Sequence, residues 1–190
     1  MKARLIYFMG PSGVGKDSLL AWLKNQLPLN DTSLYWARRS ITRAVTKEGE
    51  QHESLDMATF TALLKDGAFA MHWHANGLAY GIRHQELEPL KGNRWVLMNG
   101  SRTHWPEVRQ HFEPCYGVLI TASPAVLRQR LMRRNRETPS DIETRLARLA
   151  GHADSSAHCT IQNNTTLEAA GKSLLTQLQR LEGWPYARRD

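Results

Sequence analysis

The sequence predicts an α/β fold in which a parallel sheet is flanked by helices. Short, continuous apolar runs of strand length alternate along the chain with longer segments of helical periodicity. The first apolar run leads directly into a glycine-rich turn and then into a helical pattern, so the fold begins as strand, turn, helix. With 190 residues, of which 41% are hydrophobic, the chain is long enough to bury the core of one compact domain.

The apolar runs predict the strands. Residues 5–9 form an uninterrupted apolar run that ends at Gly10, which indicates a strand buried on both faces. Further central strands are predicted at 95–98 and 116–121, and a shorter one at 160–162.

Helical periodicity predicts the segments between and after these strands. From Lys16 onward, leucines recur on one side of a helix, and Pro28 ends the pattern. The other predicted helices cover residues 105–111, 125–133, 141–150 and 167–181. The terminal residues 183–190 are expected to form a loosely held tail.

Residues 38–90 differ from the rest of the chain in composition. They are rich in histidine and other polar residues, and only two short helical pieces are predicted, at 57–66 and 84–90. We expect this interval to be an insertion over the carboxyl edge of the sheet, where open α/β folds bind their ligands.

Charge and composition narrow the functional class. The formal charge is +7, but the clustered arginines lack the interleaved aromatic residues of a nucleic-acid platform, so phosphate binding is favoured over nucleic acid. No apolar stretch approaches the about 20 residues that span a bilayer, so a cytoplasmic protein without membrane contact is expected. Cys115 and Cys159 lack zinc-site spacing and are expected to be small buried residues.

A glycine-rich motif follows the first strand and predicts an ATP-binding loop. It has the form G-x-x-x-x-G-K, in which backbone N–H groups surround the phosphates and Lys16 reaches the β- and γ-phosphates. Its position between a buried strand and an amphipathic helix supports the prediction, because a surface turn does not need that context. The predicted nucleotide-binding residues are Gly10, Pro11, Ser12, Gly13, Val14, Gly15, Lys16, Asp17 and Ser18.

The residue after the lysine departs from the usual motif. Asp17 occupies the position where a serine or threonine ordinarily ligates Mg²⁺, and Ser18 follows it. One interpretation is that Asp17 binds Mg²⁺ directly or through water. The other is that Asp17 caps the helix and Ser18 takes the metal ion.

These motifs resemble the guanylate kinase family over nearly the whole chain. Residues 10–16 are similar to that family's loop, residues 39–43 to the start of its acceptor-binding segment, and Tyr80-Gly81 to its Y-G pair. Residues 130–146 carry the spacing of its lid, R-L-x-x-R-x-x-E-x-x-x-x-I-x-x-R-L. The resemblance implies that Arg134 and Arg145 close over the transferred phosphoryl group and are catalytic together with Lys16. It also implies a single domain with a core (1–37, 91–130 and 151–182), an acceptor-binding insertion (38–90) and a lid (131–150).

The acceptor site departs from the guanylate kinase pattern. Met71 stands at the position of the family's guanine-binding carboxylate, and Asn99 ends the strand after which the family has an acidic residue. A guanine edge presents two N–H donors that require acceptors, so a thioether and an amide should recognise it poorly. The family's second acceptor-site arginine is not evident, because Thr46 and Lys47 occupy that neighbourhood.

Residues 72–81 and 99–102 resemble instead the ribose 1,5-bisphosphate phosphokinases of bacterial phosphonate breakdown. That resemblance implies transfer of the ATP γ-phosphoryl group to ribose 1,5-bisphosphate, giving 5-phospho-α-D-ribose 1-diphosphate and ADP. Asn163 or Asn164 falls where the family contacts adenine. The predicted acceptor-binding residues are Arg39, Arg43, His52, His74, Asn76, Tyr80, Asn99 and Arg102.

Two alternative functions stay open. A nucleoside monophosphate kinase of altered base preference would share the reaction type, and a catalytically silent guanylate-kinase-like module would bind only protein partners. The loop lysine and lid arginines, which such modules need not keep, favour an enzyme with ATP, Mg²⁺ and a small phosphorylated acceptor as its ligands. The sequence leaves a homodimer possible.

Overall fold

The structure is a computed structural model that describes residues 4–28, 32–45, 51–134 and 156–187, together with 138, 140, 142–144 and 146. The chain divides into two compact units. The first comprises residues 1–7 and 30–115, and the second comprises residues 8–29 and 116–190. The boundary therefore passes through the first strand, and each unit is described by itself below.

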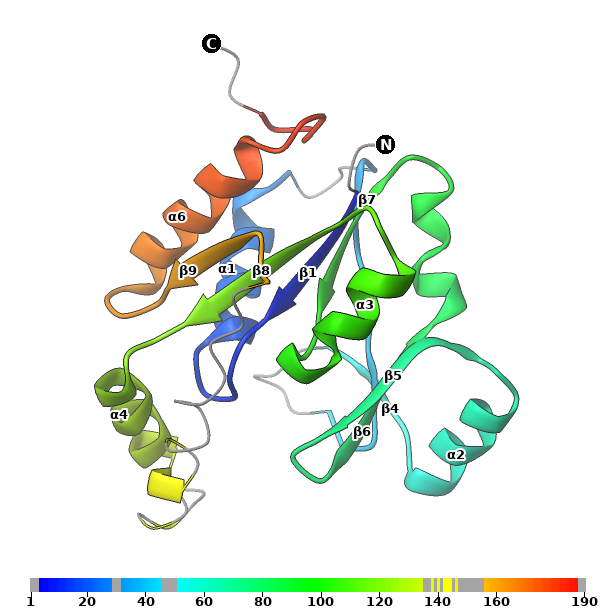
Figure 1. Ribbon diagram of the computed structural model, residues 1–190, viewed down its shortest axis with the longest axis horizontal. Coiled ribbons are helices and arrows are strands. Elements are labelled where there is room, and N and C mark those ends of the chain that lie inside the picture. The colour runs from blue at the N-terminus through cyan, green and yellow to red at the C-terminus, as the bar shows by residue number, and fades with distance from the viewer. Residues whose placement is uncertain are drawn as a thin grey trace. The chain divides into compact units, whose positions relative to one another are not determined.

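The larger sheet confirms the predicted parallel α/β fold. Its strands are β1 (Leu5–Met9), β2 (Leu34–Trp36), β7 (Trp95–Asn99), β8 (Cys115–Thr121) and β9 (Cys159–Gln162), in the order β2-β7-β1-β8-β9. Figure 1 labels all of these strands except β2. The β2–β7 and β8–β9 pairs are parallel. β1 and β7 are buried at every position, as their unbroken apolar runs predict. β2 was not predicted, because three residues carry too short a pattern.

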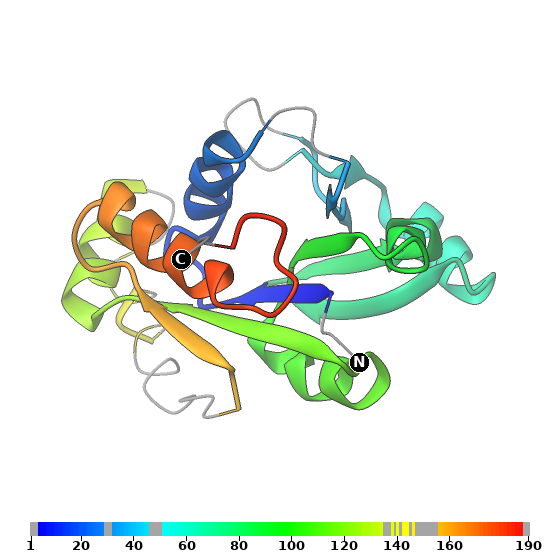
Figure 2. The ribbon, with the colours of Figure 1, turned by 90° about the horizontal axis from the view of Figure 1, so that it is seen from above.

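The described helices of the second unit include α1 (Lys16–Gln26), α4 (Pro124–Arg134) and α6 (Leu167–Gln179). α1 and α6 pack side by side (Figures 1 and 2). Gly171 makes this contact possible, because a Cβ at that position would lie 2.3 Å from Cε3 of Trp22. The Thr166 side chain caps α6 by accepting a hydrogen bond from the Ala169 N–H. These helices confirm the periodicity-based predictions to within two residues at each end.

The first unit contains a second sheet, with strands β3 (Ser40–Ile41), β4 (Glu53–Ser54), β5 (Phe69–Ala75) and β6 (Leu78–Arg83) in the order β4-β3-β6-β5. β3 pairs with β4 in parallel, and β6 pairs antiparallel with both β3 and β5. The helices of the unit are α2 (Met57–Lys65) and α3 (Trp105–His111), with three short 3-10 turns, η1 (His84–Glu86), η2 (Glu88–Leu90) and η3 (Arg102–His104).

The two short helical pieces predicted between residues 38 and 90 are confirmed as α2 and as η1 with η2, but the expectation of no other regular elements there is wrong, because the interval also contains four strands. The longest element there is the β5–β6 hairpin, whose turn residues Asn76 and Gly77 both have positive φ, 52° and 73°. Asn-Gly flanked by alternating apolar residues is the strongest short-range indication of a hairpin. The histidines that alternate with the apolar residues of β5 made this strand resemble a polar loop in the sequence. Exposed His72 and His74 alternate there with buried Met71 and Trp73, which is the pattern of a strand with one solvated face.

A separate apolar cluster stabilises this smaller sheet. Phe60 of α2 stacks on Phe69 of β5 with ring centroids 4.7 Å apart, and the cluster also includes Ala79. Asp56 caps α2 by accepting from the Thr59 N–H. A buried Phe truncated to Ala typically costs about 3–5 kcal/mol, so this small cluster is a substantial part of the unit's stability.

The remaining predictions have mixed outcomes. Of the predicted helix 141–150, residues 142–144 and 146 are helical, and the rest lie outside the described residues. The loosely held tail is wrong for residues 183–187, because Trp184 is buried and its N–H bonds the Leu181 carbonyl oxygen. Cys115 is buried as expected, and Cys159 is half-buried. Among the described helices, none combines the length and apolarity needed to cross a bilayer.

Candidate functional site

The glycine-rich loop connects β1 to α1 and is shaped by two of its glycines. Gly15 is the residue before α1 and has a left-handed φ of 88°, where a side chain is strained. A Cβ on Gly10 would lie 2.3 Å from the Ile120 carbonyl oxygen of β8. Both positions therefore require glycine. The loop ends at the first turn of a helix, whose N–H groups and dipole attract anions.

Side chains from outside the loop hold one of its carbonyl groups. The Val14 carbonyl oxygen accepts hydrogen bonds from Nδ2 of Asn163 at 2.8 Å and from a guanidinium N–H of Arg130 at 3.0 Å. Oδ1 of Asn163 lies 3.5 Å from the other terminal nitrogen of Arg130. Asn163 is buried, and these contacts fix the direction of a peptide group inside the loop. The sequence did not single out Arg130 as a site residue, although it opens the lid motif.

The two asparagines predicted to meet adenine therefore make contacts within the protein. Asn163 bonds the loop, while Oδ1 of Asn164 accepts from the Ser123 N–H at 2.7 Å and its Nδ2 donates to Gln162 at 3.3 Å. The adenine contact stays a prediction for both residues.

The residues proposed to reach the phosphates and Mg²⁺ lie in the first turn of α1. Nζ of Lys16 is 3.4 Å from the Gly10 carbonyl oxygen. Asp17 and Ser18 are exposed on the same turn. The helix cap is Gly15, so the interpretation that Asp17 caps the helix does not hold. Among the described residues, no group of three or more His, Cys, Asp or Glu could hold a metal ion.

The predicted lid is described only in part. α4 buries Leu127 and Leu131 and ends at Arg134, whose side chain is outside the described part of the chain. Arg145 lies outside the described residues, as does most of the predicted lid between residues 131 and 150. Arg128 of α4 bonds Glu143 at 2.6 Å. The roles of the two lid arginines stay predictions.

The predicted acceptor residues fall into two groups in the first unit. Arg39 and Tyr80 lie together, with the guanidinium carbon 5.3 Å from the ring centroid and both residues buried. His52 is buried too, and its Nε2 is 2.9 Å from the carbonyl oxygen of the exposed Arg43. His52 therefore positions the backbone of Arg43.

The other predicted acceptor residues are more scattered. His74 is exposed on β5, and Asn76 forms the hairpin tip, where its positive φ gives a structural reason for asparagine. Asn99 ends β7 and is buried, and the half-buried Arg102 begins η3. Substrate contact by these four residues stays a prediction.

A carboxylate that the sequence analysis missed ties the small sheet together. Glu53 accepts hydrogen bonds from Nε and a terminal nitrogen of Arg83, each at 2.8 Å, and from the Ser40 hydroxyl at 2.5 Å. Arg83 foremost, and Ser40 with it, hold the pKa of the Glu53 carboxyl below its usual value. The Glu53 carboxylate of β4 thus links Ser40 of β3 with Arg83 of β6. Strand β3, which directly follows Arg39, is therefore held by charge-assisted hydrogen bonds.

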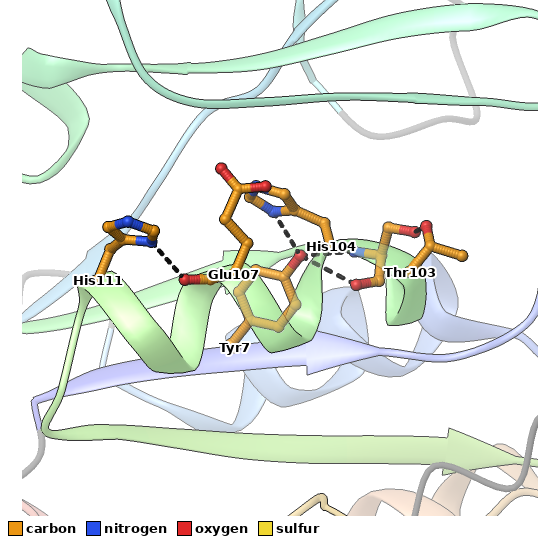
Figure 3. A network of polar contacts seen from close by, with 6 residues as sticks. Tyr7, Thr103, His104, Glu107 and His111 are labelled. Carbon is orange, nitrogen blue, oxygen red and sulfur yellow. Dashed lines mark hydrogen bonds and ion pairs between the residues drawn. The ribbon is translucent and has the colours of Figure 1, made fainter.

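A second missed feature is a polar network around Tyr7 (Figure 3). The Tyr7 hydroxyl accepts from the Ser101 N–H at 2.8 Å and lies 3.3 Å from Nδ1 of His104. Nε2 of His104 is 3.5 Å from a carboxylate oxygen of Glu107, which faces it from α3. Burial lowers the pKa of His104 and raises that of the Tyr7 hydroxyl. A Cβ on Gly100 would lie 2.0 Å from the Tyr7 ring, so this tyrosine holds the loop after β7 closely.

Comparison with known proteins places the chain in a family. No protein-family model matches it. The curated ribose 1,5-bisphosphate phosphokinase PhnN of Azotobacter vinelandii is 41% identical over 181 residues, which cover 95% of this chain and 98% of that one. The protein of the same name from Pseudomonas paraeruginosa is 46% identical over 153 residues, covering 80% of this chain and 82% of the relative.

The solved structures agree on the fold. A guanylate kinase from Anaplasma phagocytophilum superposes with a TM-score of 0.64 over 96% of this chain and 91% of that chain, at 17% identity. Such low identity shows a shared fold and leaves the substrate open. The identity to the curated relatives is much higher and extends over nearly their full length, and on that ground the chain belongs to the ribose 1,5-bisphosphate phosphokinase PhnN family.

Proposed function

We propose that the chain transfers the γ-phosphoryl group of ATP to ribose 1,5-bisphosphate, forming 5-phospho-α-D-ribose 1-diphosphate and ADP. An oxygen of the 1-phosphate forms a bond to the γ-phosphorus as the bond from that phosphorus to the β-phosphate oxygen breaks, and ADP leaves. The observation that carries the proposal is the glycine loop at the N-terminus of α1, whose Val14 carbonyl group is held by Asn163. The loop occurs in a chain that is 41% identical to a curated ribose 1,5-bisphosphate phosphokinase.

The nucleotide half of the reaction is proposed to lie on residues 10–18. The loop N–H groups and the start of α1 would surround the phosphates, and the Lys16 ammonium would stabilise charge that moves toward the β–γ bridge. Asp17 and Ser18 offer exposed oxygen ligands on that turn, which fits Mg²⁺ shared with phosphate oxygens. Mg²⁺, when bound, would neutralise phosphate charge and hold the γ-phosphoryl group in line.

The acceptor half needs positive charge more than a base, because the attacking oxygen already belongs to an anionic phosphate. Arg39, Arg43 and Arg102 are proposed to bind the two phosphates, with hydrogen bonds from His74, Asn76 and Asn99. The thioether of Met71 on β5 offers no carboxylate to a guanine edge, which disfavours guanylate as the acceptor. Residues 38–90 would then be the acceptor-binding insertion, and 131–150 the lid that brings in Arg134 and Arg145.

A coupled ADP-release assay across acceptors tests the proposal. Ribose 1,5-bisphosphate is expected to support turnover, whereas guanylate and ribose 5-phosphate should give no more ADP than ATP alone. Phosphorus NMR of the product should show the coupled doublets of a new diphosphate. Turnover with guanylate but not with ribose 1,5-bisphosphate would overturn the proposal in favour of a nucleoside monophosphate kinase. Omission of Mg²⁺ is expected to abolish activity. An unchanged Mg²⁺ concentration dependence in Asp17→Ala, which offers no oxygen ligand at this position, would remove Asp17 as a ligand.

A further inference from the structure

In the first unit, the Trp73 ring stacks with the Tyr80 and His104 rings, and the guanidinium carbon of Arg39 lies over the Tyr80 ring. The Arg39 guanidinium carbon lies 5.3 Å from the centroid of the Tyr80 ring. Tyr80 and Trp73 are parallel to within 1° with centroids 5.4 Å apart, and Trp73 and His104 stack at 5.0 Å with 22° between their planes. All four residues are at most 9% exposed. We refer to Arg39, Tyr80, Trp73 and His104 as the planar column.

The column rests on a rigid base. His104 is held by its contact with Tyr7, which is itself completely buried in β1 (Figure 3). The column members come from four separate segments: the loop before β3, strands β6 and β5, and η3. Tertiary packing therefore aligns them, and no segment could form the column alone.

The stack constrains the guanidinium in a way that suits anion binding. Stacking uses the flat face of the guanidinium, whereas its N–H groups lie in the plane and point outward from the edge. A freely rotating arginine loses about 2 kcal/mol of rotamer entropy when it is fixed, and contact with the Tyr80 ring would restrict the Arg39 guanidinium before any ligand arrives. The geometry thus prepares an arginine to bind an oxyanion with a fixed orientation.

We propose that Trp73 and His104 are positioning residues for a phosphate group of the acceptor, acting through Tyr80 on the Arg39 guanidinium. This role rests on the proposed function, because it assigns a phosphorylated acceptor to the first unit. Trp73 and His104 do not touch the acceptor themselves. They set the orientation of the arginine that does, and so they contribute to acceptor affinity and not to nucleotide affinity.

The test compares two stacks in the same unit. Trp73→Leu removes the central ring of the column, and Phe60→Leu removes an equally buried ring from the Phe60–Phe69 stack, which lies outside the column. The KM for ribose 1,5-bisphosphate is expected to rise about five- to tenfold in Trp73→Leu, from the loss of stacking and guanidinium order. The KM for ATP should stay as in the wild type. Trp73→Phe keeps a ring and should recover most of the acceptor affinity.

A double-mutant cycle with Arg39→Lys distinguishes positioning from general destabilisation. A lysine has no flat guanidinium for the column to orient, so Trp73→Leu should raise the acceptor KM little further in that background. Full additivity of the two substitutions would overturn the proposal, as would equal acceptor KM values in Trp73→Leu and Phe60→Leu. Should Trp73→Leu fail to fold by circular dichroism, His104→Leu removes the end of the column and enters the same cycle.

The outcomes also separate this inference from the proposed function. A folded wild-type protein that does not turn over ribose 1,5-bisphosphate would remove both the function and the role of the column. Normal wild-type turnover, with Trp73→Leu behaving like Phe60→Leu, would remove the role of the column alone.

Discussion

The glycine loop and the acceptor segment are built by different means. The loop is one stretch of six residues, 10–15, between β1 and α1, and its shape follows from two glycines and from the hydrogen bonds that hold the Val14 carbonyl group. We use the term acceptor segment for residues 39–104, which contain the residues proposed to bind the acceptor. The second sheet, the planar column and the hydrogen bonds of the Glu53 carboxylate bring side chains of this segment together. The difference teaches that the residues of the glycine loop form one contiguous motif, although distant side chains hold its Val14 carbonyl group, whereas the residues proposed to bind the acceptor come together only through contacts between distant segments.

The comparison predicts two kinds of response to substitution. A change in the loop alters the backbone that would contact phosphate, so it should affect nucleotide use sharply. Several contacts position each side chain of the acceptor segment, so one substitution removes only part of the support. Its effect on the acceptor KM should therefore be smaller than that of a loop substitution and should differ from one position to another.

The largest expected effect is that of Lys16→Ala. Removing a charge that is proposed to reach the transferred phosphate should lower kcat by about 10²- to 10³-fold. Lys24→Ala removes an exposed lysine from the last turn of the same helix and is the matched control. Steady-state kinetics with ribose 1,5-bisphosphate measure both variants. Undiminished turnover in Lys16→Ala would contradict the nucleotide site.

Gly15→Ala should have the next largest effect. The new Cβ would lie 2.6 Å from Nδ2 of Asn163 at a φ of 88°, so the bond to Val14 must yield and the KM for ATP should rise about tenfold or more. Gly67→Ala is the control, because its φ is also left-handed, at 66°, but its Cβ would meet nothing within 4 Å. Both variants should lose about 1–2 kcal/mol of unfolding free energy to backbone strain. Only Gly15→Ala should raise the KM for ATP.

Asn163→Ala removes the hydrogen bond from Asn163 to the Val14 carbonyl oxygen without adding backbone strain. It leaves the Val14 carbonyl group with Arg130 as its remaining side-chain donor, and the KM for ATP should rise about fivefold while the acceptor KM stays unchanged. Asn25→Ala, which removes an exposed asparagine from α1, is the control. An effect on the acceptor KM as large as that on ATP would break the distinction between the two regions.

Glu53→Gln tests the acceptor segment. Loss of the charged bonds to Arg83 should lower the unfolding free energy by about 1–2 kcal/mol and raise the acceptor KM a few-fold, with the KM for ATP unaffected. Glu88→Gln removes one partner of an exposed pair with Lys91 and should cost about 0.5 kcal/mol or less. Urea unfolding and steady-state kinetics measure the two changes. Equal destabilisation by both variants would contradict a special role for Glu53.

The smallest expected effect concerns the pH dependence of stability. Burial lowers the pKa of His104 from 6.5, against a smaller opposing effect of Glu107 and with a contribution from His72. As the pH falls through about 6.5, His104 binds a proton in the unfolded chain more readily than in the folded chain. The free energy of unfolding is therefore not reduced by His104 above that pH, and it decreases as the pH falls below it. His104→Asn should flatten the decline in unfolding free energy between about pH 7 and pH 5. His111→Asn, exposed on α3, controls for loss of an imidazole, and an unaltered slope in His104→Asn would contradict the assignment.

The candidate site contains contacts that a linear sequence can indicate and contacts that it cannot. The loop residues, Arg39 and Tyr80 were selected because they belong to contiguous motifs, and their roles stay predictions. Arg130 and Asn163 meet the loop from 116 and 149 residues away along the chain, and neither spacing is visible in a linear pattern. Trp73 and His104 each resemble an ordinary core residue until the fold stacks one on the other.

The sequence by itself determined the central strands, most helices, the glycine loop and the resemblance to a kinase family, because each depends on periodicity or on neighbouring residues. Tertiary structure alone decided the second sheet, the burial of Trp184, the brace on Val14 and the planar column. Their formation depends on which distant segments pack together, and that outcome reflects the burial and hydrogen bonding of the whole chain more than any local pattern.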